Sequence, residues 1–457
     1  MRIFDPLSPQ PRLPENFVWG VATSSFQIEG AATADGKGPS IWDTFCRVPG
    51  AIADGSDGQI ACDHYKLWEE DLDLIAGLGV DAYRFSLSWP RIRPTGRGAW
   101  NEKGLDFYER LVDGLLERGI KPYLTLNHWD LPDALQASGG WANRDTVHRF
   151  VEYANAVDKR MGSRIAAITT HNEPWVMAVL GYETGIFAPG IKSRAAAAQA
   201  SHHLLLSHGL ALQSLREQGC KAKLGIVLNL SPVQPASETA ADKAQAVLED
   251  GKLLRWYMDP LFKASYPDDV LRYLGADAPV VCAGDLQTIA TPMDFLGVNY
   301  YSRSVVSADG PWDVHKSGLE VTDMGWEVYP EGLTELLVRM HRDYPVPPMY
   351  VTENGGAFKD QYVNGRVHDA DRVRYIAQHI QAVADAIEQG VNMEGYMVWS
   401  LLDNFEWASG YAKRFGIVHV DYETQRRTLK DSALWYRSFL QHQHAESLKQ
   451  ESLALGA

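Results

Sequence analysis

The chain has 457 residues, of which 45% are hydrophobic and 22% are charged, an ordinary globular composition that permits a large core and argues against long disorder. Its net charge of −15 disfavours nucleic acid and anionic membranes as partners, and no run of Lys and Arg overrides this locally.

The N-terminal stretch MRIFDPLSPQPRLP lacks the basic and then apolar plan of a signal peptide. No window reaches the roughly 18 uncharged apolar residues that indicate a membrane span. The cysteines are far apart and form no C-x-x-C motif; they are Cys46, Cys62, Cys220 and Cys282. We therefore expect reduced thiols, no metal site, no cofactor and a cytoplasmic location.

Short apolar runs recur along the chain, with helical patterns between them. Eight runs predict strands, at residues 17–24, 82–89, 121–129, 166–174, 223–230, 295–301, 349–355 and 394–402. Apolar positions at helical spacing predict helices at residues 66–78, 103–118, 195–218 and 372–389. Two of these helices end next to a glycine that suits a C-cap, Gly119 or Gly390.

This alternation of strands and helices predicts a single α/β domain, a (β/α)8 TIM barrel, over residues 1–457. The alternative is an open doubly wound sheet, but the sequence lacks the glycine-rich phosphate turns typical of that fold. Segments 50–58, 231–250 and 302–322 are expected to be enlarged loops. A tail over about residues 445–457 is expected to fray.

Polar residues stand repeatedly where the predicted strands end. They are His128, Asn172, Glu173, Asn299, Tyr301, Glu353 and Asp403, with Trp399 nearby. One such residue is ordinarily a helix cap or a turn former. Five strand ends with this feature favour a functional site, because the carboxyl ends of the strands form the active face of such barrels.

Two of these residues, Glu173 and Glu353, are expected to share that face. Two carboxylates are what glycosidic bond cleavage requires: one protonates the departing oxygen, and the other attacks the anomeric carbon or activates water. Either glutamate alone could instead form a structural salt bridge. The aromatic content, with 14 Trp and 20 Tyr, suits a cleft that stacks on sugar rings, although core filling would also account for it.

Longer motifs carry a family resemblance over nearly the whole chain. They are FVWGVATSSFQIEG (17–30), RFSLSWPRI (84–92), NHWDLP (127–132), THNEP (170–174), GVNYYS (297–302), MGWEVYPEGL (324–333), VTENG (351–355) and NFEWASGYAKRFGIVHVDY (404–422). In these motifs the chain resembles glycoside hydrolase family 1, the β-glucosidase family. The resemblance implies a retaining, exo-acting β-glucosidase that removes terminal non-reducing β-D-glucosyl residues through a covalent glycosyl-enzyme, as in cellulose degradation.

The resemblance also implies roles for individual residues. Glu173 of the NEP motif is the expected acid/base, and Glu353 of the TENG motif is the expected nucleophile. Arg84 and Tyr301 are expected to contact Glu353, and Asn172 to bond the substrate 2-hydroxyl. Further substrate contacts are expected from Gln27, His128, Tyr301, Trp326, Trp399, Glu406, Trp407 and Phe415. Arginine beside a carboxylate favours its charged form, and ionised Glu353 should raise the pKa of Glu173.

Several histidines are interpreted as structural, namely His171, His202 and His203. His128 has no second ligand at metal spacing, so a metal is not expected there. Two positions depart from the family pattern: relatives often carry an apolar residue at His171 and an acid at Ser409. Strand alternation predicts that His171 points to the face opposite that of Asn172.

Three alternatives stay open. A 6-phospho-β-glycosidase would need cations for its phosphate, which Glu406 would repel. A non-catalytic sugar-binding protein could dispense with one carboxylate, yet both are present. A transglycosylase would share every residue named. The expected substrate is a small β-glucoside or a cello-oligosaccharide, and aryl glucosides, plant conjugates, galactosides and fucosides would fit the same residues.

Overall fold

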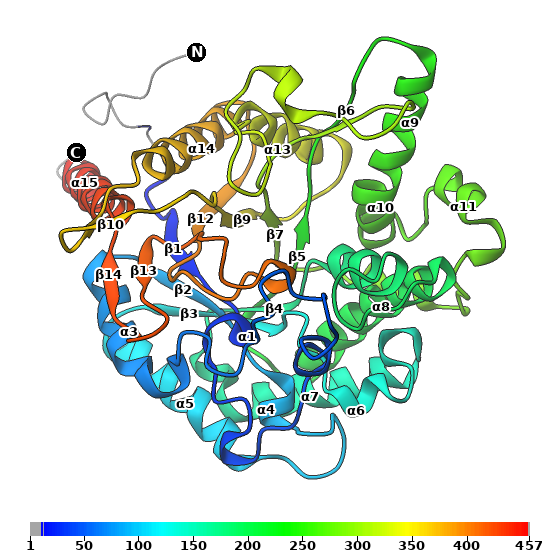
Figure 1. Ribbon diagram of the computed structural model, residues 1–457, viewed down its shortest axis with the longest axis horizontal. Helices are drawn as coiled ribbons and strands as arrows, with labels where there is room; N and C mark the ends of the chain where they lie inside the picture. Colours follow the sequence, from blue (N-terminus) through cyan, green and yellow to red (C-terminus); the bar gives the residue numbers. More distant parts are fainter. Residues whose placement is uncertain (1–10, 12, 456–457) are drawn as a thin grey trace.

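The structure is a computed structural model that describes residue 11 and residues 13–455 (Figure 1). Eight parallel strands close into a barrel in the order β1-β12-β9-β7-β5-β4-β3-β2. The strands are β1 Val18–Ala22, β2 Ala82–Ser86, β3 Lys121–Asn127, β4 Ala167–Asn172, β5 Lys223–Asn229, β7 Phe295–Asn299, β9 Met349–Asn354 and β12 Met393–Trp399. The predicted (β/α)8 barrel and all eight of its strands are confirmed.

Helices surround the barrel and connect successive strands (Figure 1). The long ones are α3 His64–Leu78, α5 Glu102–Glu117, α7 Asp145–Met161, α8 Arg194–Glu217, α13 Glu331–Asp343, α14 Ala370–Glu388 and α15 Asp431–Leu455. The four predicted helices correspond to α3, α5, α8 and α14, with ends within two residues of the prediction. No helix in the described part of the chain combines the length and the apolar character needed to cross a bilayer.

Shorter elements lie in the connections. The short helices are α1 Ser25–Ile28, α2 Ile41–Phe45, α4 Trp89–Ile92, α6 Asp133–Gln136, α9 Ala240–Asp250, α10 Trp256–Lys263, α11 Asp268–Leu274 and α12 Asp285–Ile289. Two π-helical segments are η4 Val176–Glu183 and η5 Gly251–Arg255. The short strands are β6 Val233–Pro235, β8 Ser304–Val306, β10 Tyr362–Val363, β11 Arg366–Val367, β13 Val418–Val420 and β14 Arg427–Leu429.

Side-chain alternation along the strands separates two cores. On β2, Tyr83 and Phe85 belong to the core between the barrel and its helices, whereas Ala82 belongs to a smaller core inside the barrel. Arg84 shares the inner side, and its guanidinium reaches the strand ends. This two-residue period leaves polar side chains inside the barrel above an apolar floor that includes Tyr123 and Tyr350.

The prediction of an uninterrupted loop over residues 231–250 is wrong, because this segment contains β6 and α9. Helix α9 has little apolar periodicity: Asp242, Ala246 and Asp250 are its buried residues. Polar contacts define it instead, since Thr239 caps its N-terminus and Arg339 of α13 binds Asp250. Segment 302–322 likewise contains β8, which pairs with β6.

The structure describes most of the C-terminal tail but not the first ten residues. Helix α15 continues to Leu455, so most of the tail that is expected to fray is helical. Residues 456–457 and residues 1–10, which include most of the stretch without a signal-peptide pattern, lie outside the described residues.

Candidate active site

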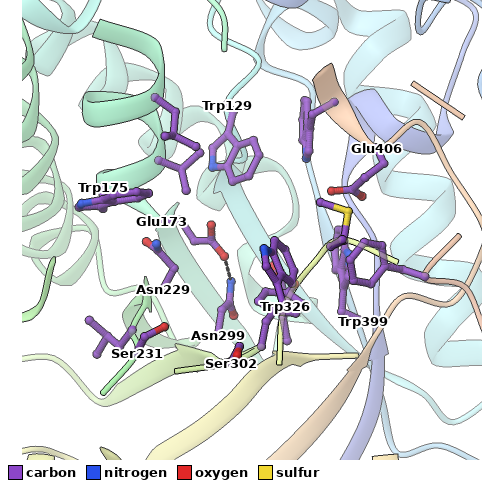
Figure 2. A pocket seen from close by; sticks show the side chains of 18 of the residues that line it. Trp129, Glu173, Trp175, Asn229, Ser231, Asn299, Ser302, Trp326, Trp399 and Glu406 are labelled. Carbon is purple, nitrogen blue, oxygen red and sulfur yellow. Dashed lines mark hydrogen bonds between the residues drawn. The ribbon is translucent and has the colours of Figure 1, made fainter. Parts of the chain in front are cut away.

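A pocket of about 280 Å³ opens at the carboxyl ends of the barrel strands (Figure 2). It brings together nine of the predicted site residues: His128, Glu173, Tyr301, Trp326, Glu353, Trp399, Glu406, Trp407 and Phe415. The other three, Gln27, Arg84 and Asn172, lie directly behind this lining and bond to it. The structure therefore brings together residues that lie more than 300 positions apart in the sequence.

Glu353 is the penultimate residue of β9, and both of its oxygens are held. Its Oε1 accepts a hydrogen bond from Arg84 Nη1 at 2.6 Å, and its Oε2 accepts one from the Tyr301 hydroxyl at 2.6 Å. Burial raises the pKa of Glu353 above its usual value, and the charge of Arg84 and the hydrogen bonds from Tyr301 and Arg84 offset part of this rise. Arg84 and Tyr301 thus favour the ionised form, as expected.

Glu173 lies in a different environment, immediately after β4. Its φ of 53° falls in the left-handed region, where a residue with a side chain is strained, and Pro174 follows. Its Oε1 accepts one hydrogen bond, from Asn299 Nδ2 at 2.6 Å (Figure 2). Burial and the charge of Glu353 raise the pKa of Glu173 well above its usual range. Of the two glutamates, Glu173 is therefore the one that holds a proton more readily.

Asn172 connects the surroundings of both glutamates. Its Oδ1 accepts hydrogen bonds from Arg84 Nη2 at 2.6 Å and from Asn299 Nδ2 at 3.0 Å. These two donors fix the orientation of the amide, and its Nδ2 then points to His128 Nε2 at 3.1 Å. Burial lowers the pKa of His128 well below its usual value, so this ring is neutral.

Glu406 follows β12 on a loop that Gln27 helps to orient. Gln27 Nε2 donates to Asn404 Oδ1 at 2.9 Å and to the Phe405 carbonyl at 3.0 Å, and it lies 3.4 Å from Glu406 Oε2. Burial and the charge of Glu353 raise the pKa of Glu406 to about 8. Glu406 is therefore largely protonated at neutral pH in the free protein.

A buried ion network anchors the same loop at Asp403. The Asp403 carboxylate accepts hydrogen bonds from Lys430 Nζ at 2.7 Å and from Arg414 Nη1 at 2.6 Å. Lys430 also binds Asp360, on the connection that follows β9. Because Asp403 and Lys430 are fully buried, their charges depend on each other. The network thus links the loop of Glu406 to the connection that follows β9.

Aromatic side chains form the walls. The Trp399 and His128 rings are stacked, with centroids 5.8 Å apart. Tyr301, Trp326 and Phe415 form a cluster with centroid distances of 5.4 to 6.1 Å. Trp407 packs against Trp129 at 4.5 Å. Flat apolar faces beside carboxyl, amide and imidazole groups suit a ligand with apolar ring faces and many hydroxyls.

Asn299 was expected at a polar strand end but was given no role in the site; it donates to Glu173 and Asn172 and accepts from Thr352 Oγ1 at 2.7 Å. Its position at the end of β7 was the available signal. The prediction also omits other residues that line the pocket, among them the apolar side chains of Trp129, Trp175, Val176, Leu180 and Met324. Within the described residues no cluster of three His, Cys, Asp or Glu side chains could hold a metal.

The remaining histidines lie away from the pocket. His202 bonds the Tyr266 hydroxyl at 2.9 Å and Asp285 at 3.0 Å, and His203 bonds the Trp141 carbonyl at 2.8 Å. Both are on α8. His171 also faces α8, on the side of β4 opposite Asn172, as strand alternation predicts.

Comparisons with known proteins agree with this geometry. "Beta-glucosidase A" of Acetivibrio thermocellus is 47% identical over 94% of this chain and 98% of its own length. "Beta-glucosidase" of an Agrobacterium species is 48% identical over 94% and 96%. The solved "Family 1 b-glucosidase from Thermotoga maritima" superimposes with a TM-score of 0.92 at 45% identity, covering 95% of this chain and 99% of that one.

The model of the family described as "Glycosyl hydrolase family 1" matches residues 9–445, which is nearly the whole chain. The motifs, the closed barrel and the two glutamates at its strand ends lead to the same assignment as these relatives: the chain belongs to glycosyl hydrolase family 1.

Proposed function

We propose that this protein is a retaining β-glucosidase that hydrolyses terminal non-reducing β-D-glucosyl residues of small β-glucosides or cello-oligosaccharides, with residues 1–457 acting as one catalytic domain. The observation that carries the proposal is the asymmetry of two buried carboxyls in one pocket. Arg84 and Tyr301 hold Glu353, whereas Glu173 has an amide partner and keeps the proton. The β-glucosidase relatives support the glucoside substrate.

The reaction then proceeds in two displacements. Ionised Glu353 attacks the anomeric carbon, while Glu173 gives its proton to the departing glycosidic oxygen. The bond from the anomeric carbon to the aglycone breaks as the bond to Glu353 forms. Glu173, now ionised, next takes a proton from water, whose oxygen displaces Glu353 from the same carbon. Two inversions give net retention.

The phosphate-bearing alternative is less well supported by the site. Glu406 lines the pocket, and an acidic side chain there offers a phosphate no positive charge and repels it once ionised. The guanidinium of Arg303, which also lines the pocket, is already bound by Glu327 at 2.6 Å. Hydrolysis and glycosyl transfer share the same intermediate, so the ratio of the two products with excess alcohol would separate a transglycosylase from a hydrolase.

Stereochemistry tests the proposal directly. Proton NMR of a fresh reaction with an aryl β-glucoside should show the β-anomer of glucose first, with the α-anomer appearing later by mutarotation. Direct attack of water, with Glu353 as a base, would instead release the α-anomer first. That result would refute the covalent mechanism.

Glu406→Ala tests the glycone contact. Losing a charged or strongly hydrogen-bonded partner of a sugar hydroxyl should cost about 1.5–3 kcal/mol, which lowers kcat/KM for β-glucosides by about one to two orders of magnitude. Glu320→Ala is a suitable control, because Glu320 lies outside the pocket and pairs with Arg374 on the surface. Unchanged glucoside kinetics in Glu406→Ala would remove Glu406 from the glycone site.

A further inference from the structure

Strand β4 is irregular just before the two residues that it delivers to the pocket. On the side of β5, Thr169 pairs with Gly225 and Asn172 pairs with Val227. Three steps along β4 therefore correspond to two steps along β5. Such a bulge redirects the side chains that follow it, and bulges recur beside active sites.

Helix α8 holds the bulge from outside the barrel. Thr170 Oγ1 bonds His208 Nδ1 at 2.8 Å, and His171 Nε2 bonds Ser207 Oγ at 2.7 Å. Two consecutive residues of β4 thus face the same helix, which regular alternation would forbid. The next residue, Asn172, faces the pocket.

His171 is also bound from the neighbouring strand. Asn127 of β3 is its partner in the barrel register, and Asn127 Nδ2 lies 3.0 Å from His171 Nδ1. Burial lowers the pKa of His171 well below its usual value, so the ring is neutral. Nδ1 then accepts from Asn127, and the Nε2 hydrogen is donated to Ser207, whose own hydroxyl donates to the Leu204 carbonyl at 2.8 Å.

The hydrogen bonds that join Asn127, His171 and Ser207 lie outside the barrel, directly behind a contact inside the pocket. The residues that follow Asn127 and His171 are His128 and Asn172, whose side chains meet inside the pocket at 3.1 Å. Asn127 Nδ2 also contacts Met177 Sδ at 3.2 Å, on the π-helical segment after Glu173. The amide of Asn127 therefore touches the chain on both sides of Glu173.

We propose that His171 is a positioning residue, which through Asn127 and Ser207 fixes the end of β4 and so aims Glu173 into the pocket. The strained backbone of Glu173 makes such support necessary, because a left-handed conformation persists only where its surroundings enforce it. The inference rests on the proposed acid/base role of Glu173.

The test uses His171→Phe, which removes both hydrogen bonds. It keeps an aromatic ring against Phe150, whose centroid lies 4.4 Å from that of His171. Proton donation matters for poor leaving groups and little for activated ones. We expect kcat/KM for an alkyl β-glucoside to fall about tenfold and that for 2,4-dinitrophenyl β-glucoside to change less than about twofold, since small misplacements cost this much. His171→Gln, which can accept from Asn127 and donate to Ser207, should restore the alkyl substrate.

His208→Phe is the matched control. It removes the adjacent buried bond to Thr170 and leaves the bridge through His171 intact. It should lower Tm without changing the ratio between the two substrates. If His171→Phe lowers both substrates equally, or neither, or if His171→Gln fails to restore activity, the positioning role is refuted.

Two further measurements keep the result decisive. If His171→Phe does not fold, Ser207→Ala replaces it and removes the hydrogen bond between His171 and Ser207. A loss of kcat/KM on the alkyl substrate alone then supports the positioning role of His171, and an equal loss on both substrates, or none, refutes it. Glu173→Ala is measured in the same series. If Glu173→Ala lowers kcat/KM equally for both substrates, the acid/base assignment is refuted. If Glu173→Ala is selective for the alkyl substrate but His171→Phe is not, only the role of His171 is refuted.

Discussion

Glu353→Gly is expected to lose nearly all hydrolysis of β-glucosides, by roughly 10⁴-fold or more in kcat, as follows from removal of a nucleophile. The variant leaves Arg84 Nη1 and the Tyr301 hydroxyl facing a space of carboxylate size. A small anion such as azide or formate can occupy that space, because its charge pairs with Arg84. Turnover of 2,4-dinitrophenyl β-glucoside should therefore recover with increasing azide.

The product identifies the face of attack. Azide that replaces Glu353 attacks opposite the leaving group, so the expected product is the α-glucosyl azide, which NMR distinguishes from the β-anomer. Glu394→Gly is a control of the same chemical change, since Glu394 lies at the other end of the barrel and binds Lys223. It should retain turnover. Full hydrolysis by Glu353→Gly would show that the nucleophile lies elsewhere.

Glu173→Ala is expected to divide substrates by their leaving groups. Loss of general acid catalysis should lower kcat/KM for alkyl glucosides and cellobiose by about 10²–10⁴-fold. Activated aryl glucosides need little protonation, so they should still form the glycosyl-enzyme and then accumulate it, because no base assists water. Added azide should release this intermediate as the β-glucosyl azide, the opposite anomer from that of Glu353→Gly.

The pH profile gives Glu173→Ala a second readout. In the unmodified enzyme, activity requires protonated Glu173, whose pKa is raised by burial and by the charge of Glu353. Activity should therefore fall as pH rises through that pKa and ionises Glu173. In Glu173→Ala this alkaline limb should disappear for activated substrates. An alkaline limb at an unchanged pH would mean that another group supplies the proton.

The barrel was predictable because its strands are short apolar runs that end in polar residues. His128, Asn172, Glu173 and Glu353 stand out for this reason. Strand ends were less well predicted: residues 82–89 were expected to form one strand, but α4 begins at Trp89, next to Pro90. Helix α9 was missed because its buried side chains include two aspartates and no long apolar residue.

The arrangement around the glutamates required the structure. Sequence motifs predict that Gln27 contacts the sugar, and only the structure shows that its amide Nε2 donates to Asn404 and to the Phe405 carbonyl behind the lining. Asn299 has an ordinary position at a strand end, and its contact with Glu173 depends on how the ends of β7 and β4 approach each other on either side of β5. The hydrophobic pattern could not reveal the bulge in β4, because Thr170 and His171 face α8 through hydrogen bonds and not through apolar contacts.

The ion pair of Arg84 with Glu353 leaves the inner pocket with no net charge. With protons on Glu173 and Glu406, the remaining carboxylate and guanidinium cancel each other, although the chain carries a net charge of −15. An uncharged sugar can thus shed its water and enter without stripping solvent from an uncompensated ion. A sugar mimic with an ammonium nitrogen would upset this balance and favour ionisation of Glu173, so that its capture would be coupled to proton release.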